Sequence, residues 1–379
     1  MKIVSIEPTP SPYSMKINLD EALPDGKTES YKLNDDLSAA PDYVHKLFAI
    51  EGVKGLYRVI HFLALERNPR VAWEQILPAV RTALGTVDSY VPEPEAGAEK
   101  AEPVFGELKV FIQYFRSIPM QVKLEEAGKE HRFGLPKRFM NAVMEASVVA
   151  DNMLAERKWV EQSPRYGAVS EVGEEVVEEI SASYDMARVD DLIKLIVEGK
   201  DDMAVAQQER KQVTLDMLDD PSWKKRYAAL DRMDPELTDL PVLDKALDDE
   251  KASVRRLATA YLGMIEAPAV LPYLYKALKD KAINVRRTAG DCLSDLGYKE
   301  AMPAMIETLQ DKSRIVRWRG AMFLYEVGDA TAIPALQQAL EDPEFEVRMQ
   351  AKLALARIES GDKAEGSIWS QMTEAIQKK

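Results

Sequence analysis

Residues 268–296 have the sequence PAVLPYLYKALKDKAINVRRTAGDCLSDL, and its pattern recurs along the last third of the chain with a period of 31 residues. A fixed period in this range is typical of stacked helical repeats. The sequence therefore predicts an α-helical solenoid. The recurring positions include a proline and a Val-Arg pair, and they are Pro241, Pro272, Pro303 and Pro334, with Arg255, Arg286, Arg317 and Arg348.

Each repeat is predicted to contain two helices. One helix has an apolar stripe at helical spacing, formed in one copy by Val254, Leu257, Ala258, Tyr261, Leu262 and Ile265. The other helix begins near the recurring proline, since a missing N–H costs nothing in the first turn. A degenerate leading copy runs from about Trp223 to Leu247, so we expect about five repeats over residues 218–361.

The pattern resembles HEAT repeats of the short type found in phycobilin lyases and related proteins. This resemblance covers roughly residues 218–361 and implies the fold, a C-terminal α-solenoid, without implying an activity. The chain has three histidines, none of them in the repeats. The His-Glu metal pairs of iron-dependent HEAT hydroxylases are therefore missing, and no metal site is predicted.

The composition excludes some classes of partner. The chain has 379 residues, of which 46% are hydrophobic, and a formal net charge of −14. It is long enough for two or three domains, and its charge does not favour nucleic-acid binding. An acidic run, predicted to be a solvated helix face, contains Glu171, Glu174, Glu175, Glu178, Glu179 and Asp185.

The location is inferred from the N-terminus and the single cysteine. The opening residues lack the apolar stretch of a signal peptide, and no segment is long and apolar enough to span a bilayer. We expect a cytoplasmic protein without a membrane contact. Cys292 stands alone, which rules out an intrachain disulfide, and its repeat position is Tyr261 or Phe323 in neighbouring copies. It is predicted to be a core residue.

Residues 1–88 have a different pattern and predict a small α/β domain. The expected strands and helices are short and separated by turn signals such as Pro24, Asp25 and Gly26. Strands are predicted at 3–6, 14–19 and 55–65, and helices at 42–50 and 72–84.

The stretch EPTPSPYSMK at residues 7–16 resembles the opening of the Nfu/NifU N-terminal domain, and so do LFAIEGV at 47–53 and Trp73. The resemblance implies the fold of that scaffold module and a surface for a protein partner. In Nfu proteins a second domain holds an iron–sulfur cluster through Cys-x-x-Cys. One cysteine cannot supply such a site, so no cofactor is predicted.

A polar, proline-containing linker is predicted at residues 89–104, followed by a second small α/β or α+β domain at 105–168. Within this domain, residues 108–114 and 120–124 are predicted strands and residues 139–160 a long helix. Residues 169–217 are expected to form a helical connection to the repeats. Residues 362–379 are expected to form a C-terminal helix or tail.

This order of domains resembles the family called conserved virulence factor C of Gram-positive Bacillales. The family's own domain is placed on FIQYFRSIP at 111–119 and FGLP at 133–136. The resemblance implies a regulatory contribution to toxin and exoprotein expression in pathogenic members. It implies no molecular activity.

The motifs of common enzymes are missing. There is no Gly-x-Ser-x-Gly elbow and no Gly-x-x-x-x-Gly-Lys phosphate loop. His45, His61 and His131 are each predicted to be packed or surface histidines rather than ligands. We therefore expect a protein that is not an enzyme and has no catalytic residues.

Three groups of side chains are candidates for contacts with a protein partner, one in the N-terminal loop, one in the middle segment and one in the repeats. A basic cluster with interleaved aromatics in the middle segment could instead line an anion or RNA site. The arginine column of the repeats is expected to pair with the aspartates six residues earlier and to fix neighbouring repeats. The candidate partner contacts are Glu7, Thr9, Pro10, Lys16, Arg116, Lys137, Arg138, Arg256, Arg287 and Trp318.

The sequence thus favours a non-enzymatic cytoplasmic adaptor that binds proteins through its solenoid and its Nfu-like module. The alternative is an accessory factor in iron–sulfur cluster or iron handling that lacks its own Cys-x-x-Cys site. Retention of iron after anaerobic purification distinguishes the alternative from the adaptor.

Overall fold

The computed structural model describes residues 1–9, 11–24, 27–85, 107–126, 129–150, 152–200 and 212–361. The chain forms two compact units, residues 1–105 together with 299–379, and residues 106–298. The predicted linker at 89–104 and the predicted tail at 362–379 lie outside the described residues. Multidomain α/β and all-α architecture is confirmed.

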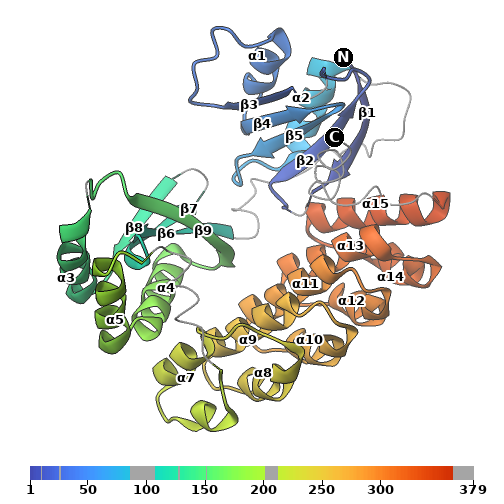
Figure 1. The fold of residues 1–379 in the computed structure, drawn as a ribbon. Coiled ribbons are helices and arrows are strands. Elements are labelled where there is room, and N and C mark those ends of the chain that lie inside the picture. Colours follow the sequence, from blue (N-terminus) through green and yellow to red (C-terminus); the bar gives the residue numbers. More distant parts are fainter. Residues whose placement is uncertain are drawn as a thin grey trace. The chain divides into compact units, whose positions relative to one another are not determined.

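The first unit contains a five-stranded antiparallel sheet with the order β1-β2-β5-β4-β3 (Figure 1). Two helices complete this small domain. The strands are β1 (Ile3–Pro8), β2 (Ser14–Leu19), β3 (Thr28–Lys32), β4 (Val53–Val59) and β5 (Phe62–Arg67), and the helices are α1 (Asp42–Phe48) and α2 (Trp73–Leu84).

The sequence located most of these elements, but its prediction of one strand over residues 55–65 is wrong. The chain turns at Ile60 and His61, and β4 pairs with β5 as a hairpin. Ile60 has a φ of 48°, a left-handed conformation that a β-branched residue rarely adopts. This turn has no Asn-Gly or Asp-Gly signature and lies within a mostly apolar stretch, so the sequence did not mark it as a hairpin turn.

The core of this domain includes a helix from the end of the chain. The side chains of Trp73, Ile17 and Leu63 are fully buried in it. Met349 belongs to the same apolar cluster, and Phe345 and Leu353 pack against it. These three residues lie on α15 (Phe345–Ser360), so the last repeat helix and the N-terminal domain share one core.

The second unit begins with a four-stranded antiparallel sheet of order β8-β7-β6-β9. Three helices lie side by side against one face of it (Figure 1). The strands are β6 (Glu107–Phe115), β7 (Ile118–Glu126), β8 (Lys129–Gly134) and β9 (Arg157–Tyr166), and the helices are α3 (Lys137–Ala146), α4 (Val169–Ser183) and α5 (Met186–Val197).

The prediction of one long helix over residues 139–160 is wrong. Helix α3 ends at Ala146, a short 3₁₀ turn η1 (Ser147–Val149) follows, and the chain then enters β9. Strand β9 pairs with β6, about fifty residues earlier, through a register that includes Ile112 and Val160. The local periodicity of the sequence carries no information about a strand partner that lies so far away in the chain.

Helices α4 and α5, in the region predicted as a connection, contribute to the core under this sheet. Val172, Val176 and Ile180 of α4 and Leu192 and Ile196 of α5 belong to the same buried cluster as the sheet residues. Residues 201–211 of this region lie outside the described residues, and its described part is helical over α4 and α5. Its apolar faces attach it to the sheet.

The repeats follow as pairs of helices. In each pair the shorter helix carries the recurring proline in its first turn, as predicted. The second unit holds α7 (Trp223–Leu230), α8 (Leu240–Leu247), α9 (Ala252–Met264), α10 (Leu271–Ala277) and α11 (Ile283–Leu296). The first unit holds α12 (Met302–Thr308), α13 (Arg314–Val327), α14 (Ile333–Ala339) and α15. Within the described ranges, no helix is sufficiently long and apolar to cross a bilayer.

Cys292 lies in the core between α9 and α11, as predicted. Its Sγ is 3.5 Å from the carbonyl oxygen of Thr259, and burial raises the pKa of the thiol to about 12. Close packing extends to Gly263, where an added Cβ would lie 2.4 Å from the sulfur.

We expect the native protein to resist thiol reagents at pH 8. With a pKa of about 12, the thiolate fraction is about a thousandfold lower than for a free cysteine. Reaction with Ellman's reagent should therefore be slow until denaturant is added, and then reach one thiol per chain. Fast labelling of the folded protein would contradict the burial of Cys292.

Candidate functional site

The N-terminal loop that was predicted to contact a partner is held by its own chain. Thr9 is only 3% exposed, and its hydroxyl donates to the carbonyl oxygen of Ser14 at 3.1 Å. Lys16 is 2% exposed and pairs with Glu7 at 2.9 Å. Pro10 lies outside the described residues. Of these four candidates, Glu7 retains partial exposure, so the role of the loop in partner binding stays a prediction.

Arg67 organises the packing behind this loop. The side chain is fully buried, and its Nη1 donates to the carbonyl oxygen of Val71 at 2.6 Å. Its Nη2 pairs with Glu346 of α15 at 2.9 Å, and Glu346 is itself 3% exposed. The guanidinium lies over the rings of Tyr13 and Trp73. One buried ion pair thus connects the N-terminal domain to the last repeat.

Two of the three basic residues of the middle domain that were predicted to contact a partner have a local partner. Arg116 pairs with Glu156 at 2.8 Å. Arg138 donates to the carbonyl oxygens of Ser181 and Tyr184, at the C-terminal end of α4, where a cation is favourable. Lys137, the first residue of α3, is exposed. The predicted cluster is therefore dispersed over several elements.

The face of the β6–β9 sheet opposite the helices carries a cation–aromatic group that the sequence analysis missed. The Nζ of Lys123 lies 4.4 Å from the ring centre of Phe111 and 5.2 Å from that of Trp159. Lys123 also pairs with Glu125 and Glu130. The sequence contained one signal for this group, which is the alternation of side chains between the two faces of a strand. Because Val110 and Ile112 are buried on one face, Phe111 lies on the other.

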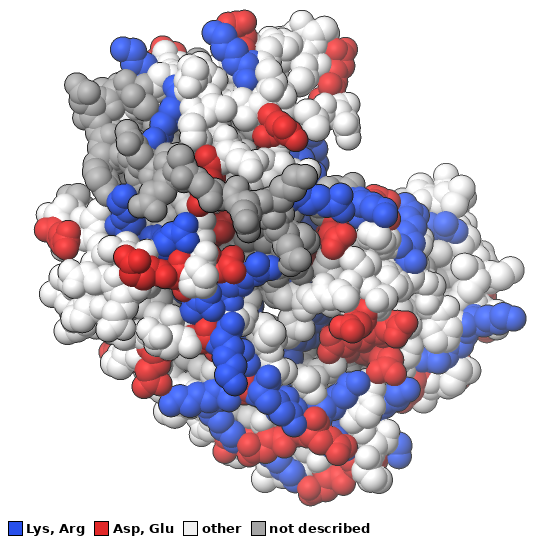
Figure 2. All heavy atoms as spheres, turned by 180° about the vertical axis from the view of Figure 1, so that it is seen from behind, with Lys and Arg blue, Asp and Glu red and all other residues white. Residues whose placement is uncertain are grey.

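Charged side chains of both signs are interspersed on the face of the molecule in Figure 2, and each sign gathers only in small groups. The described residues on this face therefore form no large basic field of the kind that a phosphate backbone would contact. The expectation against nucleic-acid binding stays a prediction.

The arginine column fastens neighbouring repeats, but through different aspartates than predicted. Arg255 donates from Nη1 to the backbone carbonyl of Asp249, six residues earlier, at 2.8 Å. Its Nε and Nη2 contact the carboxylate of Asp280, in the next repeat, at 2.6 and 2.9 Å. Arg317 does the same with Asp342. The side-chain partner is thus 25 residues later, which makes Arg255 and Arg317 clamps between repeats.

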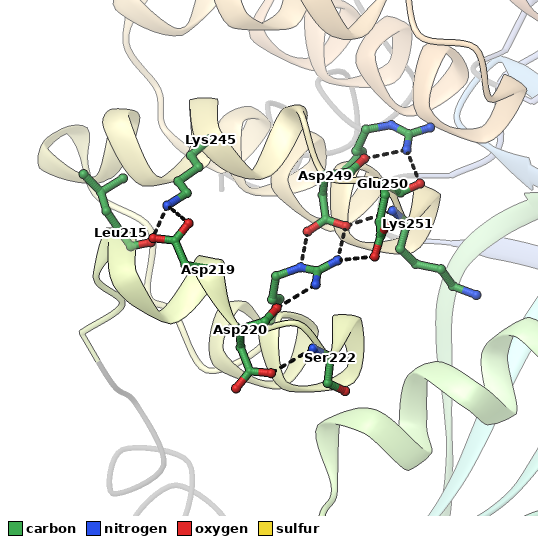
Figure 3. Close-up of polar contacts among 10 residues, drawn as sticks. Leu215, Asp219, Asp220, Ser222, Lys245, Asp249, Glu250 and Lys251 are labelled. Atoms are coloured by element: carbon green, nitrogen blue, oxygen red, sulfur yellow. Dashed lines mark hydrogen bonds and ion pairs between the residues drawn. The ribbon is translucent and has the colours of Figure 1, made fainter.

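The leading repeat has its own clamp, Arg226, which lies 29 rather than 31 residues before Arg255. Figure 3 shows Asp249 and Glu250 around this guanidinium, with Asp220 below it. Its Nε is 2.6 Å from Asp249. The 31-residue register points to Lys224 instead, so the shift hid this residue from the sequence analysis.

The last clamp ends on the N-terminal domain. Arg348 donates to the backbone carbonyl of Asp342 at 2.7 Å, as its counterparts do in earlier repeats. Its Nη2 lies 3.4 Å from Glu74 of α2. Glu74 therefore supplies the carboxylate that a following repeat supplies elsewhere, and the N-terminal domain caps this end of the array.

The three repeat residues predicted to face a partner are largely enclosed. Trp318 is 2% exposed, and Arg319 lies over its ring. Arg287 is 4% exposed, pairs with Asp291 and lies 5.4 Å from the ring centre of Tyr166. Arg256 pairs with Glu179 of α4. Partner contact through these side chains stays a prediction, and their observed contacts lie within the chain.

The acidic run on α4 is partly buried, contrary to the expectation of a solvated face. Glu179 is 5% exposed and accepts from Arg165 at 2.7 Å and from Arg256 at 3.3 Å. Burial acts to raise the pKa of Glu179, but Arg256 and Arg165 outweigh it and hold the pKa below its usual value. Glu175 accepts from Ser253 at 3.1 Å. This face of α4 therefore packs against α9.

The histidines do not form a metal site in the part of the chain that the structure describes. His45 and His61 are exposed, on α1 and in the β4–β5 turn. Across the described ranges, no group of three or more His, Cys, Asp or Glu side chains is placed to hold a metal ion.

Three protein-family models match the chain, and together they define its class. Scaffold protein Nfu/NifU N terminal matches residues 4–89, Virulence factor matches residues 113–193, and HEAT repeats match residues 212–289 and 272–356. The chain is therefore a HEAT-repeat protein with an Nfu-type N-terminal domain and a virulence-factor domain between them.

Relatives match over the whole length. Conserved virulence factor C of Staphylococcus aureus is 46% identical over 377 residues, covering 98% of this chain and 99% of the relative. The chain belongs to this family, as the sequence predicted. Uncharacterized protein YpgR of Bacillus subtilis is 57% identical over 379 residues, covering 100% of both chains. The crystal structure of protein SAV1430 from Staphylococcus aureus is 32% identical and covers 22% of this chain and 98% of that chain, with a TM-score of 0.21.

Proposed function

We propose that the chain is a cytoplasmic protein-binding scaffold that performs no chemistry of its own. HEAT arrays offer extended surfaces to other proteins, and the name of the staphylococcal relatives supports a role connected with virulence. The proposed regulatory effect on exported toxins would then act through the proteins that the scaffold holds.

The observation that carries this proposal is an exposed apolar stripe on α3. Met140 is 50% exposed, Met144 is 64% exposed, and Val148 in the following turn is 76% exposed. Met140 and Met144 are four residues apart, so they lie on one face of the helix, and Val148 follows four residues later in the 3₁₀ turn. We call these three residues the methionine stripe. The opposite face of α3, with Phe139 and Val143, is buried against the sheet.

The charge beside the stripe indicates the chemistry of the partner. Lys137 is exposed three residues before Met140, on the same side of the helix. Flexible methionines suit apolar anchors of varied shape. We therefore assign the stripe to a protein segment that presents apolar side chains with an acidic residue at one end, as an amphipathic helix does.

The test compares full-length baits in cell extract. The double substitution Met140→Asp and Met144→Asp should remove the specific partners that the wild-type chain retains, because it places charge in an apolar contact. Met186→Asp is the matched control, since Met186 is 58% exposed and lies in the first turn of another helix. Circular dichroism verifies that all three baits are folded.

The identified partner is then titrated with the purified baits. At least tenfold weaker binding to the double variant, with unchanged binding to Met186→Asp, is the expected result. Equal binding to all three baits would reject the stripe as the binding surface. A wild-type bait that retains no specific protein would reject the scaffold function.

A further inference from the structure

The two faces of the N-terminal sheet have different surroundings. Residues of α1, α2 and α15 pack on the face that holds Ile17 and Leu63, because all of them belong to one apolar cluster. Side chains alternate between the faces along a strand, so Lys16 and Phe62 lie on the opposite face. The register pairs Lys16 of β2 with Ala64 of β5 there. We call this the outer face, with Lys16, Phe62 and Ala64 at its centre.

The centre of the outer face is more deeply buried than its sheet neighbours explain. Lys16 is 2% exposed and Phe62 is 6% exposed. Ser30, which lies on the same face in the edge strand β3, is exposed. Adjacent strands lie beside a side chain, about 4.8 Å away, and leave the space above it open. The burial at the centre therefore requires a further segment above the sheet.

The outer face can accept apolar side chains, because its buried cation is already neutralised. The Nζ of Lys16 pairs with Glu7 of the neighbouring strand β1 at 2.9 Å. It also lies 5.3 Å from the ring centre of Phe62. The aliphatic part of Lys16 and the ring of Phe62 thus offer apolar surface, and an apolar cover would leave no charge on this face unpaired by burying Lys16.

Residues 362–379, which lie outside the described residues, follow a helix that contacts this domain. We call them the tail segment, and they belong to the same unit as the N-terminal domain. Leu353 of α15 packs against the domain core, and α15 ends at Ser360, roughly 10 Å further along the helix. Gly361 has a φ of 73°, a left-handed conformation that ends the helix.

The length of the tail segment allows it to reach the outer face. Residues 362–366 span up to about 17 Å when extended, which exceeds the spacing of about 10 Å between packed layers. A helix over residues 367–379 would be about 20 Å long. That length crosses about four strands at about 4.8 Å each.

The sequence of the tail segment suits a cover of this kind. Ile368, Met372 and Ile376 are four residues apart, and Trp369 falls on the same side of a helix. The other side would carry polar residues such as Ser370. A helix of this length is marginal in water by itself, so its stability would come from packing its apolar side.

We propose that the tail segment folds as an amphipathic helix over the outer face, with Trp369 and Met372 against Phe62 and the aliphatic part of Lys16. While it is bound, this face of the Nfu-type domain is closed to other proteins, and a partner reaches it only by displacing the tail segment. The methionine stripe lies on α3, so the two proposals can fail separately.

Thiol labelling of the full-length chain tests the cover. Met372→Cys and Ser370→Cys place a thiol on opposite sides of the proposed helix, and the wild type corrects for Cys292. Met372→Cys should react with Ellman's reagent at least tenfold more slowly than Ser370→Cys, and at the same rate in denaturant. Equal rates in the native chain would overturn the proposal.

A second substitution places the cover on the sheet. Ala64→Glu adds a charge to the centre of the outer face and should speed the labelling of Met372→Cys at least tenfold. Ser30→Glu, at the exposed edge of the same face, is the matched control and should leave the rate unchanged. Slow labelling that persists in a folded Ala64→Glu chain would overturn the assignment to this face.

Photo-crosslinking locates the cover even if Ala64→Glu unfolds. With p-benzoylphenylalanine in place of Trp369, crosslinks within one chain to β2 or β5 are expected, and mass spectrometry of the peptides identifies them. Crosslinks to other segments would overturn the site. A crosslinked dimer as the main product would show that the tail segment covers a second copy, which would overturn a cover within one chain.

Discussion

Replacing Arg67 by methionine is expected to lower the free energy of unfolding of the N-terminal domain by about 3–5 kcal/mol. The substitution leaves Glu346, which is 3% exposed, as a buried charge without its partner. It also removes the hydrogen bond to Val71 and the cation contacts with Tyr13 and Trp73. Methionine is similar in length to arginine, so the loss of stability reflects the removal of the charge rather than the creation of a cavity.

Urea denaturation followed by tryptophan fluorescence measures this effect, and a double variant separates its causes. Arg67→Met combined with Glu346→Met should lose less stability than Arg67→Met alone, because no buried charge remains. Arg70→Met is the control on the same segment, where the side chain is exposed, and should change the stability by less than about 0.5 kcal/mol. A loss below 1 kcal/mol in Arg67→Met would contradict a buried ion pair.

Replacing Glu179 by glutamine is expected to destabilise the second unit by a similar amount, about 3–5 kcal/mol. Glutamine keeps the shape of the side chain and removes the negative charge between Arg165 and Arg256. Both arginines would then remain buried without a counter-ion. Glu178→Gln, one residue earlier, is the matched control, because the Glu178 side chain is 52% exposed.

The stability difference between wild type and Glu179→Gln should depend on pH in a defined direction. The folded-state pKa of Glu179 lies below its usual value, because Arg256 and Arg165 outweigh the effect of burial. Its contribution is therefore fully present above the unfolded pKa of about 4.3 and is lost as the pH falls through the lower folded-state value. Thermal unfolding midpoints between pH 7 and pH 3 measure this change. A difference that stays constant down to pH 3 would contradict the lowered pKa.

The solenoid was predictable because the same apolar positions recur in every copy of the repeat, so one sequence shows the pattern several times. A position such as Leu293, fully buried in α11, has an equivalent in each copy. The first-turn prolines gave the helix boundaries, since proline is tolerated there and not further along a helix.

The failures have a common physical cause, which is that distant partners override local patterns. Strand β9 looked helical until β6 was available as its partner. Glu179 was predicted to be solvated because the residues near it in the sequence do not indicate that it pairs with Arg165 and Arg256. The sequence likewise indicated the arginine column correctly and paired it with the nearer aspartate, whereas the geometry uses the backbone of that residue and the carboxylate of the next repeat.

The candidate site was less predictable than the fold for the same reason. An arginine or tryptophan at a repeat position such as Trp318 is suited both to a partner surface and to a packed interior, and only the packed structure distinguishes them. The methionine stripe was hidden within the predicted long helix, where its continuation beyond Ala146 made the apolar residues look like one buried face.

The clamp between Arg348 and Glu74 has a consequence for synthesis on the ribosome. The helices and strands of the N-terminal domain have been synthesised by about residue 85, yet Glu346, Arg348 and Met349, which contact this domain, follow roughly 260 residues later. At about 5–20 residues per second, the surface of the N-terminal domain that packs against α15 stays exposed for tens of seconds, until α15 has been synthesised. During that interval the unpaired Arg67 and the open apolar core are accessible to chaperones, so final maturation of the first domain depends on completion of the last repeat.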